Sequence, residues 1–330
     1  MIKHNRHINH MFLLFPAIIF CLSIATISFG QEQKLTWENG QVKAVGSLEN
    51  GYKKGEWTYY RSNGSKEAVG SYLPEESSRT YSIVKRNRKT AVDDEKSTRH
   101  GKWTYFYSNG QKKAEAVYEN GCPTGTLTKW YPNGNKFETF EYIDCKPLGD
   151  RKTWHEDGWL QLEILKEEGG KSTRIEYYDN SQKKSITPYR NGQQYGRVTH
   201  WYKNGSKKQE VMMKNAKVHG AFRSWHENGQ IKMSYFSINN VMSGEYNEWA
   251  EDGQVLWSFV ELSDSKVIDV KQYWNNGQIK LKGKSALPRT LSIHHWTQSR
   301  NGYWIYYYRD GTVKKSEKYD RGRLVNVVMP

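Results

Sequence analysis

The sequence predicts an all-β fold, an elongated antiparallel meander of about twelve tandem β-hairpin repeats of roughly 24 residues. Three observations predict it. A glycine recurs at steps of about 24 residues, an aromatic residue follows at the fifth position, and Asn-Gly or Asp-Gly follows at the eighth and ninth. Such self-similarity is the signature of repeat proteins, in which each unit buries its apolar surface against its neighbours.

The repeat unit is clearest where two copies are compared. The segments that begin at Gly55 and Gly101 both read Gly-x-Trp-Thr-Tyr-aromatic-x-Ser-Asn-Gly, with the glycine counted as position zero. Ser172 and Ile268 stand in place of the glycine in two other units. The unit starts are Gly55, Gly101, Gly125, Gly149, Ser172, Gly196, Gly220, Gly244, Ile268 and Gly302.

All ten of these units carry an aromatic residue at the fifth position. We expect these residues to be mainly structural, packing neighbouring hairpins together and filling the core. A platform on which sugars or nucleobases stack is the alternative. The residues are Tyr60, Phe106, Trp130, Trp154, Tyr177, Trp201, Trp225, Trp249, Tyr273 and Tyr307.

The Asn-Gly and Asp-Gly pairs predict the tight turn of each hairpin. Both residues of Asn63-Gly64 tolerate the positive φ that a type I′ turn requires. The leading glycine is expected in the return turn between units. Each unit is then strand, turn, strand, turn, which gives a meander of about 24 strands. At ~4.8 Å between strands, the ribbon is on the order of 115 Å long.

One feature of the unit conflicts with simple strand alternation. Apolar residues at the second position, such as Trp57 and Trp103, and the aromatic residues at the fifth position have opposite parity. A bulge in the strand would reconcile them, and so would a fifth residue that already belongs to the turn.

The repeats account for nearly all of residues 31–330. Trp37-Glu38-Asn39-Gly40 places an opening unit at about Gln31. Gly55 and Gly101 are separated by almost two periods, and residues 79–100 between them are interpreted as a degenerate repeat. An extra loop is expected at about residues 284–299, because the spacing to the last unit is too long.

Residues 1–30 have the features of a secretory signal peptide. A basic segment opens the chain, the apolar run Met11–Ile27 follows, and Ser28 and Gly30 are the small residues that precede a cleavage site. We therefore expect an exported protein that is periplasmic, associated with the outer envelope or secreted. An uncleaved membrane anchor and lipoprotein processing at Cys21 are the alternatives.

The composition excludes membrane proteins and disordered proteins, but it leaves the role of the positive net charge open. A mean hydropathy of −0.91 is too low for a membrane protein, and 14% aromatic residues are too many for a disordered one. The net charge of +15 falls to +13 when Lys3 and Arg6 are removed with the signal peptide.

The excess lysine recurs at fixed repeat positions, which favours a solvated surface that prevents aggregation of sheet edges. An anionic partner, such as an envelope glycan or lipid, is the alternative. Its candidate contacts are the densest basic cluster, Lys85, Arg86, Arg88 and Lys89. No nucleic-acid partner is expected.

The cysteines allow one disulfide after export. Cys122 and Cys145 are separated by almost one repeat, so adjacent units could bring them together in an oxidising compartment. Their offsets from the following unit start differ by one residue, which can aim the two side chains apart. The sequence leaves the bond open.

No catalytic, cofactor-binding or metal-binding constellation is found, and the protein is expected not to be an enzyme. His155 and His226 share the sixth repeat position, which favours a structural role. His294 and His295 lie in the extra loop beside Trp296. A solvated loop is favoured there over a ligand contact.

The units resemble MORN repeats, specifically the bacterial variant found in YwqK-type antitoxins. Strings such as His100–Gly110 and His219–Gly229 carry the resemblance, which covers nearly all of residues 31–330. It implies an antiparallel hairpin ribbon with a scaffold role, and binding to proteins or membrane lipids. In the antitoxin branch it implies neutralisation of a partner toxin by binding. Choline-binding cell-wall repeats are a weaker resemblance that keeps glycan binding as a rival.

These observations predict an exported, non-enzymatic repeat scaffold that mediates protein–protein interaction, with antitoxin or immunity-like neutralisation as one form of it. The partner is an unidentified protein. The rival prediction is a cell-envelope binder of glycan or anionic lipid, based on the basic charge and the periodic aromatic residues.

Overall fold

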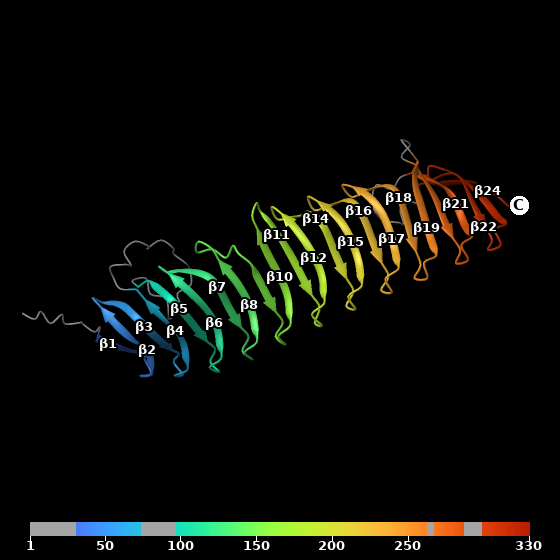
Figure 1. The fold of residues 1–330 in the computed structure, drawn as a ribbon. Coiled ribbons are helices and arrows are strands. Elements are labelled where there is room, and N and C mark those ends of the chain that lie inside the picture. Colours follow the sequence, from blue (N-terminus) through green and yellow to red (C-terminus); the bar gives the residue numbers. More distant parts are fainter. Residues whose placement is uncertain (1–30, 74–96, 263–266, 287–298) are drawn as a thin grey trace, which may run out of the picture.

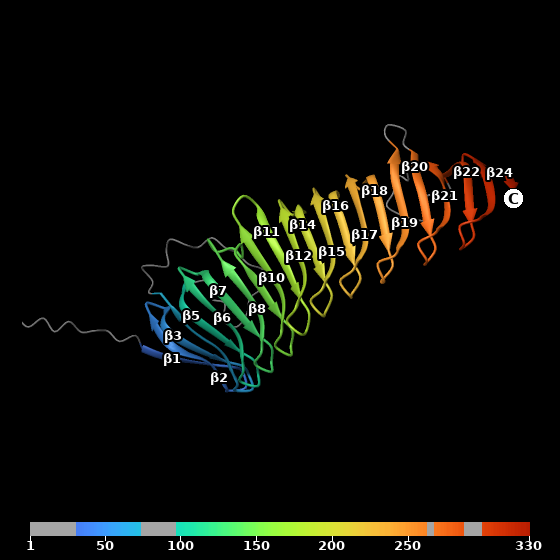
Figure 2. The same cartoon turned by 45° about the vertical axis from the view of Figure 1, so that its right-hand side comes forward.

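The computed structural model describes residues 31–73, 97–262, 267–286 and 299–330. Within them the chain forms one antiparallel sheet of 24 strands and no α-helix. Figures 1 and 2 show a long, single-layered, twisted ribbon in which the strands succeed one another from end to end. The predicted all-β meander is confirmed. In the described part of the chain, no helix has the length and apolar character needed to cross a membrane.

The first twelve strands are β1 (Gln31–Thr36), β2 (Val42–Glu49), β3 (Tyr52–Tyr60), β4 (Lys66–Tyr72), β5 (Arg99–Phe106), β6 (Lys112–Glu119), β7 (Cys122–Trp130), β8 (Lys136–Tyr142), β9 (Arg151–Trp154), β10 (Leu160–Glu167), β11 (Lys171–Tyr177) and β12 (Lys183–Arg190). The others are β13 (Gln193–Gln194), β14 (Gly196–Trp201), β15 (Lys207–Lys214), β16 (Lys217–Trp225), β17 (Ile231–Ile238), β18 (Val241–Trp249), β19 (Val255–Leu262), β20 (Val267–Tyr273), β21 (Ile279–Ala286), β22 (Arg300–Tyr307), β23 (Val313–Asp320) and β24 (Arg323–Val328).

Several sequence-based predictions fall outside the described residues. They are the signal peptide at 1–30, most of the degenerate repeat at 79–100 and most of the extra loop at 284–299. The basic cluster and the histidine pair also lie outside the described residues. They are Lys85, Arg86, Arg88, Lys89, His294 and His295.

The Asn-Gly and Asp-Gly turns close the hairpins along one edge of the ribbon, hereafter the hairpin edge. The amide of Gly64 donates to the carbonyl of Arg61, and the amide of Arg61 donates to the carbonyl of Ser65, both at 2.9 Å. Gly64 has a φ of +82°, whereas Asn63 is not among the residues with positive φ. This is a type I turn followed by a left-handed glycine, so the predicted type I′ turn is wrong here. The Asn63 side chain supports the turn instead, because its Oδ1 accepts the amide of Ser65 at 3.0 Å.

Two-residue turns with the type I′ signature lie at the opposite edge, hereafter the return edge, where one unit passes to the next. Asn50 and Gly51 have φ of +52° and +81°, and they separate the paired residues Glu49 and Tyr52. Positive φ at both central residues defines this turn type. The second Asn-Gly pair of the repeat, rather than the first, therefore makes the type I′ hairpin.

The leading glycine does not form the return turn that was predicted for it. Gly55, with a φ of +64°, lies inside β3, and the pairing of β3 with β2 skips it and the residue after it. The glycine therefore makes a bulge within the strand. Among the ten aligned units, those that begin with Ser172 and Ile268 lack this glycine. In both, the ladder to the preceding strand runs without a register shift.

A second register shift resolves the parity of the fifth position. Tyr59 pairs with Ala68, but Tyr60 pairs with Lys66, so Glu67 at the twelfth position is an extra residue in β4. The fifth-position residue is the last residue of its strand. It lies on the face opposite to the second and fourth positions, because successive strand residues alternate in direction. The shift recurs at the equivalent place in other hairpins, including β5–β6, β7–β8, β14–β15 and β22–β23.

Side chains at the second, fourth, thirteenth, fifteenth and seventeenth positions share one face of the sheet, hereafter the core face. Buried side chains of this face form two clusters, one toward each end of the ribbon. The N-terminal cluster contains Ala44, Trp57, Tyr59, Ala68, Tyr72 and Trp103. The C-terminal cluster contains Met242, Tyr246, Phe259, Ile268, Val270, Leu281 and Trp304.

The largest buried side chains of the core face lie against glycines. Trp103 is 0% exposed, and its indole Nε1 donates to the carbonyl of Ser71 at 3.1 Å. A Cβ added to Gly70 would lie 2.1 Å from this ring. Since carbon atoms cannot approach so closely, only glycine allows the indole to rest on the neighbouring strand. The pairs Gly46–Trp57 and Gly283–Trp304 repeat the arrangement.

Candidate interaction surface

The face opposite the core face, hereafter the ladder face, carries the residues at the first, third, fifth, eleventh and fourteenth positions. All ten fifth-position aromatic residues are half-buried on it, and none belongs to the buried core. Rings at the second and fourth positions, such as Trp57 and Tyr59, belong to the buried core instead. Each fifth-position ring therefore keeps part of its surface available along the whole ribbon.

Lysine side chains cover several of these rings. A lysine at the eleventh position of one unit lies over the fifth-position ring of the next, with the ammonium 5.3 to 5.8 Å from the ring centroid. Such cation–π contacts hold the lysine stem against the ring while its charge stays hydrated. The pairs are Lys66–Phe106, Lys112–Trp130, Lys136–Trp154 and Lys207–Trp225.

A second row of rings, at the sixth position, links successive units. The hydroxyl of Tyr202 donates to the carbonyl of Trp225 at 2.9 Å, and the extra residue Lys208 lies 5.4 Å from the Tyr202 ring. His226 occupies the same position, with its Nε2 2.9 Å from the carbonyl of Trp249. The ring nitrogen must be the donor in that bond, since a carbonyl only accepts. The structural role predicted for His226 therefore has a defined partner. The contact that this row makes between units was not predicted from the sequence.

Carboxylates at the fourteenth position lie between cations on the ladder face. Glu115 is 3.0 Å from both Lys102 and Lys112. Burial raises the pKa of Glu115, but the hydrogen bonds from the two lysines outweigh it and leave the pKa below its ordinary value. Glu210 lies between Arg197 and Lys207 in the same way, at 3.8 and 3.1 Å. The carboxylates of this face therefore partly neutralise its positive charge.

One fifth-position ring is engaged by a carboxylate. The hydroxyl of Tyr177 donates to Glu163 at 2.6 Å, and Lys152 is 2.7 Å from the same carboxylate. Burial and the Glu163 contact raise the pKa of Tyr177 to about 12. The Tyr177 hydroxyl therefore stays protonated at neutral pH and acts as a hydrogen-bond donor.

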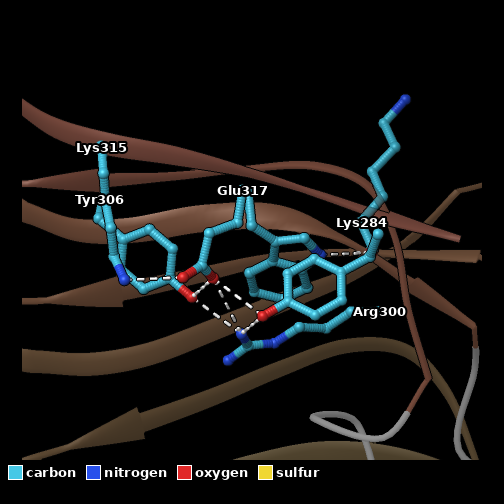
Figure 3. Close-up of polar contacts among 7 residues, drawn as sticks. Lys284, Arg300, Tyr306, Lys315 and Glu317 are labelled. Atoms are coloured by element: carbon cyan, nitrogen blue, oxygen red, sulfur yellow. Dashed lines mark hydrogen bonds and ion pairs between the residues drawn. The ribbon is translucent and has the colours of Figure 1, made fainter. Parts of the chain in front are cut away.

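A polar cluster lies on the core face near the end of the ribbon (Figure 3). Glu317 accepts hydrogen bonds from Tyr306 at 2.6 Å and Tyr319 at 2.9 Å. Lys315 and Arg300 are 2.7 and 3.7 Å from its carboxylate. Burial raises the pKa of Glu317, but the hydrogen bonds from Lys315, Tyr306 and Tyr319 together lower it below its ordinary value. All four neighbours are held by one carboxylate, an arrangement suited to holding strands together.

We expect this cluster to make the stability of the last hairpins depend on pH. Because the folded-state pKa of Glu317 is lowered, its stabilisation is present above about pH 4.5 and is lost as the pH falls through the folded pKa. Replacement by glutamine should cost about 2 kcal/mol at pH 7, as for a hydrogen bond to a charged group. Hydrogen exchange of β22 and β23 at pH 7 and pH 3 would test this.

The Glu317→Gln variant should show a smaller loss of protection between the two pH values than the wild type. Glu38→Gln, an exposed change at the hairpin edge, is the matched control and should follow the wild type. Equal pH dependence of β22 and β23 in wild type and Glu317→Gln would contradict the assignment.

The structure joins Cys122 and Cys145 by a disulfide, with their Cα atoms 5.0 Å apart. Cys122 is the first residue of β7, and Cys145 occupies a left-handed turn position with a φ of +63°. Both therefore lie on the return edge, where neighbouring units meet. The bond ties the turn before β7 to the turn after β8.

The described part of the chain shows no cluster of metal ligands. Among those residues, no group of three or more His, Cys, Asp or Glu side chains could hold a metal ion. His155 stacks on Trp159 with ring centroids 5.1 Å apart and lies 3.2 Å from Asp157. These contacts are local to one turn of the hairpin edge.

Comparison with known proteins gives a family for three of the repeats. The family described as MORN repeat variant matches residues 99–120, 194–215 and 218–239. No curated protein matches the sequence.

Similar solved structures are distant. The Tc holotoxin pore of Photorhabdus luminescens is 11% identical, with a TM-score of 0.20, over 90% of this chain and 18% of that one. A TcdB2–TccC3 structure is 12% identical, with a TM-score of 0.16, over 88% of this chain and 18% of that one. A porin-like protein from Bacteroides uniformis is 11% identical, with a TM-score of 0.18, over 69% and 95% of the two chains. This chain thus spans less than a fifth of the toxin-complex chains, and similarities this weak carry no argument about function.

The three matched segments coincide with units of the ribbon. Each segment begins two residues before a unit start, at Gly101, Gly196 or Gly220, and ends in the turn at the return edge. At these three repeats, the chain carries MORN repeats of the variant type.

Proposed function

We propose that the protein is an exported, non-enzymatic repeat scaffold that binds a partner protein through its ladder face. The observation that carries the proposal is the continuous row of half-buried aromatic rings along that face, bordered by exposed lysines. Repeat ribbons offer such extended surfaces for binding, and partly exposed aromatic side chains are the usual anchors of protein interfaces. Neutralisation of a toxin by binding, as in an immunity protein, is a finer form of this proposal.

The disulfide supports the exported location within this proposal. Bonds such as Cys122–Cys145 persist in oxidising compartments and are rare in the cytosol. The same bond stiffens the ribbon, which reduces the entropy lost when a partner binds along several units.

The test is affinity capture by tagged residues 31–330 from envelope extract of the source cells, at low and high salt, with mass spectrometry. A partner bound through the ladder face should be recovered at both salt concentrations. Its recovery should fall at least tenfold when Trp130, Trp225 and Trp249 are replaced by serine. The matched control replaces Lys171, Lys214 and Lys217, exposed residues near the return edge, by glutamine and should leave recovery unchanged. The absence of any protein whose recovery depends on the ladder face would refute the proposal.

A second candidate is an envelope binder, favoured by the lysines that border the rings. Lys112, Lys136 and Lys207 are exposed at the eleventh position, and they lie on the same side as the aromatic row. Retention on isolated cell wall or anionic vesicles should then weaken with salt, because exposed charges are screened. Retention that is absent at low salt would exclude this candidate.

A further inference from the structure

Two hollows on the ladder face occupy the same place in the repeat. One, of about 630 Å³, lies between Gln41, Val42 and the fifth-position ring of the next unit, Tyr60. The other, of about 410 Å³, lies between Gln254, Val255 and Tyr273. In both, a glutamine at the tenth position and a valine at the eleventh face a tyrosine at the fifth position of the following unit. The recurrence of this set makes each hollow a property of the repeat.

The eleventh residue differs between the covered rings and the two hollows. In four units it is a lysine that lies over the next ring, as Lys112 does over Trp130. Valine is too short to do so, and Val42 and Val255 leave a hollow beside Tyr60 and Tyr273. Two other rings are occupied in different ways. The Tyr177 hydroxyl is bound by Glu163, and Tyr307 has Lys282 at 5.5 Å from its centroid.

We propose that the hollows at Tyr60 and Tyr273 are two equivalent subsites for an uncharged pyranose ring. This inference goes beyond both candidate functions, because it rests on neutral contacts and not on the lysines. The apolar face of a sugar ring can stack on the exposed part of a tyrosine, which is amphipathic in the same way. The glutamine amide at the edge of each hollow can donate to and accept from ring hydroxyls. An apolar wall with a few polar groups is the usual composition of a small-ligand site.

The charges of the hollows favour a neutral ligand. The first hollow is lined by Glu32 and Lys34, which have opposite signs, and none of the described residues that line the second is charged. An anionic headgroup would find no excess of positive charge in either. At the second hollow, the Oε1 atom of Gln254 is shielded from solvent and accepts no hydrogen bond within the described residues. A sugar hydroxyl that reaches this amide after a small rotation would supply the missing donor.

The test uses the protein labelled with 3-fluorotyrosine and titrated with soluble hexasaccharides. The probes are cellohexaose, maltohexaose and the hexamer of N-acetylglucosamine, with hexagalacturonate as the anionic comparison. At least one neutral probe should shift the fluorine resonances of Tyr60 and Tyr273, which are assigned with the Tyr60→Phe and Tyr273→Phe variants. If no neutral probe shifts these resonances at millimolar concentration, or if only the anionic one does, the proposal is overturned.

The repeat itself supplies matched variants for this test. Val42→Lys and Val255→Lys install the residue that other units already carry at the eleventh position, so the fold should be retained. Each should abolish the shift at its own tyrosine and leave the other unchanged. Conversely, Lys112→Val should open a third subsite at Trp130, detected as a sugar-dependent change in tryptophan fluorescence that is larger in this variant than in the wild type. Sugar-induced shifts that persist in the Val42→Lys, Val255→Lys double variant would refute the assignment.

The outcome is separable from that of the proposed protein scaffold. A protein partner held by Trp130, Trp225 and Trp249 would still be captured by the Val42→Lys, Val255→Lys double variant. Loss of sugar binding with retained capture identifies the hollows as the sugar subsites. Capture that is lost together with sugar binding would place the protein partner in the hollows and overturn the sugar assignment.

Discussion

Replacing Trp103 with alanine is expected to lower the free energy of unfolding of the N-terminal units by about 4 kcal/mol. The side chain is 0% exposed, and its ring lies 5.2 Å from Tyr72 and 6.1 Å from Tyr105, centroid to centroid. The guanidinium of Arg99 lies 4.7 Å from the same ring. Removing the indole therefore leaves a cavity that no single neighbour can fill in a one-layered sheet. Denaturant unfolding, combined with hydrogen exchange of β4 and β5, measures the loss.

The matched control is Trp225→Ala on the ladder face. It removes the same atoms from a half-buried position beneath Lys207, and should cost about 1–2 kcal/mol because less area is buried. Hydrogen exchange should show the Trp103→Ala loss near β4 and β5 and the Trp225→Ala loss near β15 and β16, since repeat arrays lose stability locally. Equal losses for the two variants would contradict the division into a core face and a ladder face.

Removing the disulfide is expected to cost about 3 kcal/mol in the units that it joins, because a bond across 23 residues restricts the unfolded chain. The change is the double variant Cys122→Ser, Cys145→Ser. Hydrogen exchange of β7 and β8 should quicken, while β22 and β23 should be unaffected.

Reduction of the wild-type protein provides the comparison. It should lower stability by about the same amount as the double variant, and adding reductant to the double variant should change nothing further. If reduced and oxidised wild type unfold at the same denaturant concentration, the bond does not contribute in the way that chain entropy predicts.

The fold was accessible to sequence analysis because the pairing is local. Apart from the two-residue β13, each strand pairs with the next one along the chain, so a count of units gives the order of the strands directly. The turn types were not accessible in the same way. Both turns of the repeat contain Asn-Gly, but Asn63 has a negative φ in a three-residue loop and Asn50 has a positive φ in a two-residue loop. The dipeptide alone does not fix the loop length that distinguishes them.

The candidate surface was predicted in part. The ten fifth-position rings were identified as a row, but their assignment to the core was not met, because Trp57 and Tyr59 occupy that face. The glycine partners of the buried tryptophans were missed. A signal was present, since Gly46 and Gly70 each precede, by one strand, a tryptophan at the second position. The change from lysine to valine at the eleventh position can also be seen in the sequence. Its effect on ring exposure could not be predicted, because the sequence does not show which ring lies beside that residue.

By itself, the sequence determined the repeat, its period, the antiparallel meander and the positions of the aromatic rows, because these depend on residues close together in the chain. Only the tertiary structure decided which face each row occupies, which lysine covers which ring, and where Tyr60 and Tyr273 remain open. These features depend on the bulges at the leading glycine and at the twelfth position, which shift one strand against the next. A register shift of one residue exchanges the faces of a strand, so burial is settled across strands and cannot be derived within one.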